Sequence, residues 1–190
     1  MGGMFDPRGF AAGWRHVFRT TGRRPAALDR NTASDPQAAL ICARAGPPVT
    51  WITAEMTCRV PLHRAAQHRL AAAGGPLAAA LDRARAIWRD DWLRTTVPPT
   101  TGPALVPPDG VAFLHDPLTV AALFPGAWLT LRDARLAYAI EGGLFRLRPA
   151  SDGRVARASV AVDGAAFERF FVDRVGRCLA RRSGPPAHAE

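Results

Sequence analysis

The residues best suited to chemistry in this sequence are His115 and Asp116, which stand side by side before Pro117. A histidine titrates near neutral pH and can therefore give a proton to a leaving group. A carboxylate is a ligand for a hard cation such as Ca²⁺, and an Asp before a Pro also suits the cap of a helix. The motif therefore allows two interpretations, a functional pair at a helix start or a helix cap beside a loop histidine.

A second polar segment lies upstream and contains Asn31 and the pair Asp35-Pro36. The Asn31 amide can donate to and accept from a vicinal diol, or it can fold onto its own backbone in a turn. We assign Asp35 to capping rather than to chemistry, because Pro36 suits the first position of the helix that follows.

Five segments of the chain, in their order, resemble segments in the C-terminal half of the inosine–uridine preferring nucleoside hydrolases. Each match is short, and the order and spacing of all five carry the resemblance. The segments are Met1-Gly2-Gly3, Gly22 to Asn31, Asp35-Pro36-Gln37-Ala38-Ala39, Val49 to Thr57 with its ending Ala54-Glu55-Met56-Thr57, and His115-Asp116-Pro117.

The resemblance implies hydrolysis of the N-glycosidic bond of a ribonucleoside with the help of a bound Ca²⁺, which lowers the pKa of a water and holds the ribose hydroxyls. It implies that Asp116 is a calcium ligand and that His115 faces the leaving base as its proton donor. It also implies that Asn31 bonds the ribose, that Asp29 replaces a Glu at the far end of the sugar, and that Arg23 replaces a ribose-contacting Asn. Asp29 can equally be a solvated loop acid.

The sequence also departs from the family, because the acidic motif Asp-x-Asp-x-x-x-Asp-Asp that supplies most metal ligands and the general base has no counterpart here. We therefore expect the isolated chain to bind calcium poorly and to be a weak or inactive hydrolase. Two alternatives remain open: a non-catalytic module that binds a nucleoside or ribose, and one half of a split hydrolase that works with a partner chain or as a homo-oligomer.

The composition of the chain limits which kinds of protein it can be. All 25 basic residues are arginines, and they are scattered, so the net charge of +9 indicates solvated surface rather than a nucleic-acid site. Three cysteines and the absence of a signal peptide or a long apolar run predict a cytoplasmic protein without a membrane span.

The pattern of apolar residues predicts an α/β fold: an incomplete nucleoside hydrolase-like (Rossmann-like) mixed sheet flanked by helices, with antiparallel strands near the C-terminus. One domain is expected over residues 1–182, and a disordered tail over 183–190. In one predicted helix, Leu77, Leu81, Ala84, Trp88 and Trp92 form a buried stripe. The predicted helices are 8–20, 36–45, 62–73, 77–94, one that begins at the His115 motif, and one that Asp163 caps. The predicted strands are 49–53, 128–140, 144–148 and 155–162. Residues 95–110 are predicted to be a loop.

Overall fold

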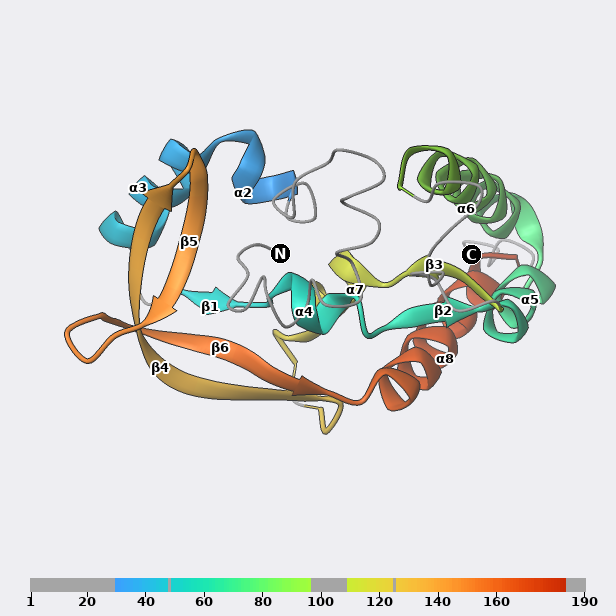
Figure 1. Ribbon diagram of the computed structural model, residues 1–190. Coiled ribbons are helices and arrows are strands. Elements are labelled where there is room, and N and C mark those ends of the chain that lie inside the picture. The colour runs from blue at the N-terminus through green and yellow to red at the C-terminus, as the bar shows by residue number, and fades with distance from the viewer. Residues whose placement is uncertain (1–29, 48, 97–108, 125, 184–190) are drawn as a thin grey trace, which may run out of the picture.

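The computed structural model describes residues 30–47, 49–96, 109–124 and 126–183 (Figure 1). A four-stranded sheet with helices α2 and α3 forms one end of the molecule, and helices α5, α6 and α8 form the other. A two-stranded sheet and two short helices, α4 (Ala54–Thr57) and α7 (His115–Ala121), lie between them. The predicted helix 8–20 and most of the predicted loop 95–110 lie outside the described residues.

The larger sheet has the strand order β1-β6-β4-β5, in which β1 runs parallel to β6 and the other pairs are antiparallel. Gly142 and Gly143 join β4 to β5 with φ angles of 57° and 77°, the left-handed conformation that a two-residue hairpin turn requires. The α/β class with antiparallel strands late in the chain is therefore confirmed. The strands are β1 (Thr50–Trp51), β4 (Leu129–Glu141), β5 (Leu144–Pro149) and β6 (Arg154–Val162).

Helices α2 (Arg30–Ser34) and α3 (Pro36–Ala45) pack against this sheet, α3 on β4 and β5 and α2 on β5. The α3 helix begins as predicted, because the Asp35 carboxylate accepts a hydrogen bond of 2.9 Å from the Ala38 N–H. Beneath α3 the sheet buries three aromatic rings whose centroids lie between 5.6 and 6.0 Å apart. They belong to Trp51, Tyr138 and Phe145.

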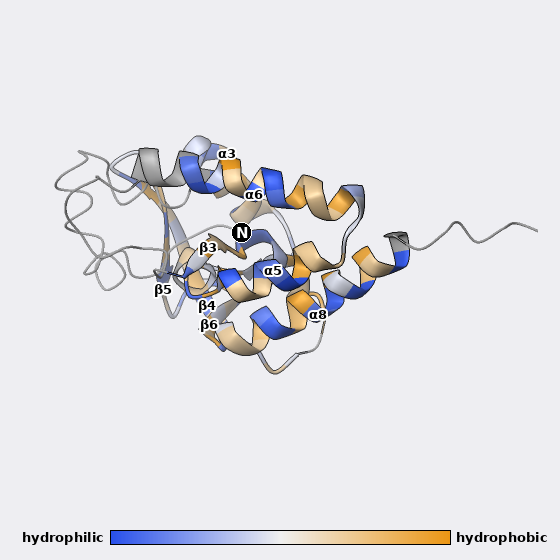
Figure 2. Cartoon of the chain, turned by 90° about the vertical axis from the view of Figure 1, so that its right-hand side faces the viewer, coloured by the Kyte–Doolittle hydropathy of each residue, from blue (hydrophilic) through white to orange (hydrophobic). Residues whose placement is uncertain are grey.

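The other end of the molecule is built from the remaining helices and the small sheet. Helices α5, α6 and α8 are mutual neighbours with apolar residues (orange) along each (Figure 2). The predicted cap of the closing helix is confirmed, since the Asp163 carboxylate accepts from the Ala166 N–H at 2.9 Å. The elements are β2 (Pro61–His63), α5 (Arg64–Ala72), α6 (Gly75–Thr96), β3 (Gly110–Phe113) and α8 (Gly164–Ser183).

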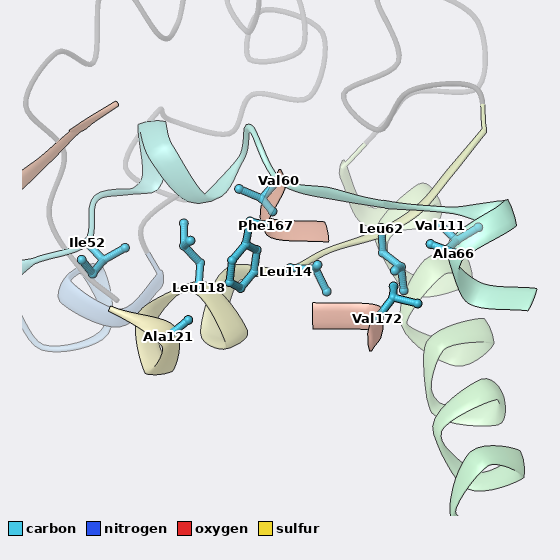
Figure 3. Packing of buried hydrophobic residues seen from close by; sticks show 10 residues of the cluster. All are labelled: Ile52, Val60, Leu62, Ala66, Val111, Leu114, Leu118, Ala121, Phe167 and Val172. Atoms are coloured by element: carbon cyan, nitrogen blue, oxygen red, sulfur yellow. The ribbon is translucent and has the colours of Figure 1, made fainter. Parts of the chain in front are cut away.

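A second hydrophobic cluster joins the small sheet to α7 and α8 (Figure 3). Val60 and Leu118 are completely buried, and Phe167 is 1% exposed and points between Leu118 and Leu114. This cluster fixes α7 against the α8 helix, and it therefore fixes the position of His115 at the start of α7.

Two expectations about this end of the molecule were wrong. The predicted helix 62–73 begins only at Arg64, because residues 61–63 pair with β3 as a strand. The first part of the predicted buried stripe of α6 is exposed, with Leu77 45% and Leu81 47% accessible, whereas Ala78 is the buried residue of that turn. The small side chain of Ala78 thus faces the neighbouring elements in this part of α6. Further along the stripe Trp88 is half-buried, and the side chain of Trp92 lies outside the described residues.

Among the helices in the described parts of the chain, none is both long enough and apolar enough to cross a membrane.

Candidate functional site

Two segments that are far apart in the sequence meet near the centre of the molecule (Figure 1). Strands β2 and β3 are antiparallel, with Pro61 opposite Phe113. The residues just before Pro61 and just after Phe113 therefore lie at the same end of the pair. This arrangement places α4, which ends at Thr57, against α7, which begins at His115.

The imidazole of His115 is held on two sides. Its Nδ1 atom lies 2.8 Å from Oγ1 of Thr57, whose side chain is completely buried. Its ring packs at 46° against the ring of Phe113, with the centroids 5.3 Å apart. These contacts leave Nε2, on the other side of the ring from Nδ1, as the nitrogen that can face a ligand.

Burial lowers the pKa of His115 below its usual value of 6.5, and the neighbouring Asp116 carboxylate opposes this shift. Removing the ring from water disfavours the charged imidazolium, which explains the direction of the change. At neutral pH the ring is therefore mainly the neutral imidazole, with one nitrogen protonated and the other able to accept a proton.

Asp116 does not cap the helix, and that expectation was wrong. The N-cap position is Leu114, and α7 starts two residues earlier than a cap at Asp116 would place it, so Asp116 lies in the first turn with an exposed side chain. A carboxylate there still interacts favourably with the free N–H groups of the turn. Pro117 follows within the first turn, where its missing N–H breaks no helical hydrogen bond.

The side chains around Asp116 do not form a calcium site by themselves. Ca²⁺ takes six to eight oxygen ligands, several of them usually carboxylates. Within the described ranges, no group of three or more His, Cys, Asp or Glu side chains is arranged to hold a metal ion. The described residues therefore do not fit the ion that the resemblance implies.

The structure places Asn31 on α2, exposed, where the helix packs on α3 and β5. His115 belongs to α7, which packs against α4, so these two predicted site residues are carried by different groups of elements. Asp29 and Arg23 lie outside the described residues.

The residue that sequence reasoning missed at this site is Thr57. The segment Ala54-Glu55-Met56-Thr57 had been matched to a family segment, but no role was given to its last residue. The signal that could have found it is its chemistry, since Thr57 is a hydrogen-bonding residue in the short segment after the predicted strand 49–53.

A carboxylate on α8 stabilises the strand that positions the site. Glu168 accepts hydrogen bonds from the backbone N–H of His63 at 2.5 Å and from its ring Nδ1 at 2.9 Å. This link fastens β2 to α8, and β2 in turn carries the pairing that brings α4 and α7 together.

A cavity of about 170 Å³ lies apart from His115, between α5, α6, α8 and β3. Its wall is mainly aliphatic, and one edge carries a polar group in which Asp82 accepts hydrogen bonds from Gln67 and Arg85. The bond from Gln67 is the largest contribution to the lowered pKa of Asp82.

The fold is similar to that of known nucleoside hydrolases. The purine-preferring ribonucleoside hydrolase from Gardnerella vaginalis matches with a TM-score of 0.66 and 22% identity, over 80% of this chain and 47% of that one. A plant nucleoside hydrolase matches with a TM-score of 0.60 and 20% identity, over 78% of this chain and 47% of that one. The chain thus spans about half the length of either enzyme. No family model and no curated protein matches it.

Proposed function

We propose that this chain binds a ribonucleoside beside His115 and that its reaction class is hydrolysis of the N-glycosidic bond. The observation that carries the proposal is the anchored imidazole of His115, held by Thr57, in a fold similar to that of two nucleoside hydrolases over about four-fifths of this chain. The ribose contacts of Asn31, Asp29 and Arg23 are part of the same proposal.

In this reaction the bond between C1′ of the ribose and a base nitrogen breaks, and its electron pair leaves with the base. A water oxygen forms the new bond to C1′ and gives up a proton. The base leaves more easily when a proton reaches one of its ring nitrogens. Nε2 of His115 is the atom that would deliver that proton, because Nδ1 is engaged by Thr57; the ring must first take up a proton at Nε2 from solvent and returns to the neutral form when it gives that proton to the base.

We expect the chain by itself to be a weak catalyst. Activation of the water needs a base and, in the family it resembles, a calcium ion; the described side chains offer Asp116 without a cluster around it. The same observation favours a second candidate function, a nucleoside-binding module that does not hydrolyse its ligand. A third arrangement, in which a partner chain supplies the missing acids, would restore turnover.

The test is to measure binding and turnover of inosine and uridine by the purified full chain, with and without added Ca²⁺. Calorimetry reports binding, and release of reducing sugar reports hydrolysis. His115→Ala should weaken binding or turnover, whereas His68→Ala, at an exposed position of α5, should leave both unchanged. A chain that neither binds nor hydrolyses either nucleoside would refute the proposal.

Binding without hydrolysis would select the non-catalytic module. Turnover that appears only on mixing with a chain carrying an Asp-x-Asp-x-x-x-Asp-Asp motif would select the split enzyme. Equal behaviour of the wild type and His115→Ala would show that the ligand site lies elsewhere.

A further inference from the structure

We infer that Thr57 is a positioning residue which, through its hydroxyl, holds His115 in the Nδ1–H tautomer and reserves Nε2 for proton exchange. The inference concerns the role of a residue in α4 that the resemblance does not assign. The expected effect on catalysis rests on the proposed function, whereas the hydrogen bond to His115 and the tautomer of its ring do not.

The first step is the direction of the hydrogen bonds at Thr57. The hydroxyl Oγ1 donates to the backbone carbonyl of Ala54 at 3.4 Å, and it lies 2.8 Å from Nδ1 of His115. A hydroxyl has one proton to donate and two lone pairs to accept with. The Ala54 carbonyl can only accept, so we place the hydroxyl proton there; Oγ1 then accepts from His115, and Nδ1 carries the hydrogen. The order of donation is then His115 to Thr57 to Ala54.

The second step is the rigidity of this chain of bonds. Thr57 is completely buried, and Ala54 is 2% exposed, so water does not compete for either group. Hydrogen bonds in series polarise one another and strengthen in a low-dielectric interior. The ring of Phe113 at 5.3 Å limits rotation of the imidazole on another side. One tautomer and one orientation are therefore favoured together.

The third step is the consequence for Nε2. A neutral imidazole with hydrogen on Nδ1 has its lone pair on Nε2, and the protonated ring has its exchangeable proton there. When the proton leaves Nε2 for a departing base, the ring relaxes to the tautomer that Thr57 already stabilises. No rotation of the ring is needed between the two states. Thr57 therefore acts on the reaction through His115 and does not touch the substrate.

The test measures the tautomer of His115 directly, by the ¹⁵N chemical shifts of its ring nitrogens at a pH where the imidazole is neutral. We expect the Nδ1–H tautomer in the full-length wild type, although free histidine prefers Nε2–H. Thr57→Ser retains the hydroxyl and should keep the Nδ1–H tautomer. Thr57→Val has nearly the same shape without the hydroxyl and should shift the population toward Nε2–H.

A matched control is Thr53→Val, which makes the same change at another buried Thr. The Thr53 hydroxyl lies 3.5 Å from Ser159 Oγ, not beside the imidazole. This variant should leave the ¹⁵N shifts of His115 unchanged. An Nε2–H tautomer in the wild type, or an unchanged spectrum in folded Thr57→Val, would overturn the inference. The wild-type spectrum alone decides the matter if Thr57→Val does not fold.

If the chain hydrolyses nucleosides, Thr57→Val should lower kcat by about 10- to 100-fold, the range seen when the outer hydrogen-bond partner of a metal-bound histidine is removed. KM should stay within about twofold, because Thr57 acts through His115 and not on the substrate. Thr57→Ser should restore most of kcat. A chain without any nucleoside turnover would refute the proposed catalysis but leave the tautomer measurement valid, so the two failures are distinguishable.

Discussion

The close approach of Gly164 to the segment between α4 and β2 gives the sharpest structural prediction. A Cβ atom at Gly164 would lie 2.3 Å from the carbonyl oxygen of Arg59. Ordinary contacts begin at 3.4 Å, so Gly164→Ala must displace one backbone from the other by about 1 Å in a close-packed region. Gly176 belongs to the same helix, and a Cβ there meets nothing within 4 Å. Gly176→Ala is therefore a matched control.

Overpacking and helix propensity change the free energy of unfolding in opposite directions. Overpacking costs about 1–3 kcal/mol, and the better helix propensity of Ala returns at most about 1 kcal/mol, so Gly164→Ala should lower the free energy of unfolding by up to about 3 kcal/mol. Gly176→Ala gains only the propensity term and should raise the free energy of unfolding by about 0.5–1 kcal/mol. For a chain of this size each kcal/mol moves Tm by roughly 2–4 °C.

The assay is urea and thermal unfolding of both variants beside the wild type, followed by circular dichroism. Because Arg59 lies two residues after Thr57, Gly164→Ala should also shift the NMR signals of the His115 ring, and Gly176→Ala should not. If Gly164→Ala were as stable as Gly176→Ala, the contact between α8 and Arg59 would be looser than the structure has it, and the reasoning would be wrong.

Three further predictions concern the core, a helix cap and the candidate site. Phe167→Ala should lower the free energy of unfolding by about 3–5 kcal/mol, whereas Phe124→Ala, at a side chain that is 61% exposed, should change it little; urea unfolding compares them. Asp163→Ala should cost about 0.5–2 kcal/mol by removing the cap of α8, and Asp163→Asn should restore most of it. Because burial lowers the pKa of His115, the unfolded chain binds more protons below pH 6.5, so the free energy of unfolding should fall as the pH drops from 6.5 toward that lowered pKa. His115→Gln should reduce this pH dependence. An NMR titration that gives the ring a pKa above 6.5 would contradict the prediction.

The sequence predicted the elements whose signals are local. The cap at Asp35, the cap at Asp163 and the Gly142-Gly143 turn each depend on a few neighbouring residues, and all three are present in the structure. The strands of the antiparallel region were also located correctly, because their alternation and turns lie within one continuous stretch.

The expectations that failed depended on contacts distant in the sequence. Leu62 and His63 were predicted to start a helix, and they form a strand because β3 lies beside them. The apolar residues of α6 looked like a core stripe, but the helix packs through Ala78 and leaves Leu81 half exposed. Periodicity shows that a helix has an apolar face; it does not show which part of that face a neighbour covers.

The sequence by itself determined that His115 and Asp116 stand together at a helix start, because both residues and Pro117 belong to one local motif. The tertiary structure decided that Thr57, 58 residues away, holds the imidazole. That contact depends on the register between two strands of three and four residues, which is fixed by the packing of Val60, Leu118 and Phe167 around them. Such a register follows from the whole core rather than from any short stretch of chain, so only the folded protein reveals it.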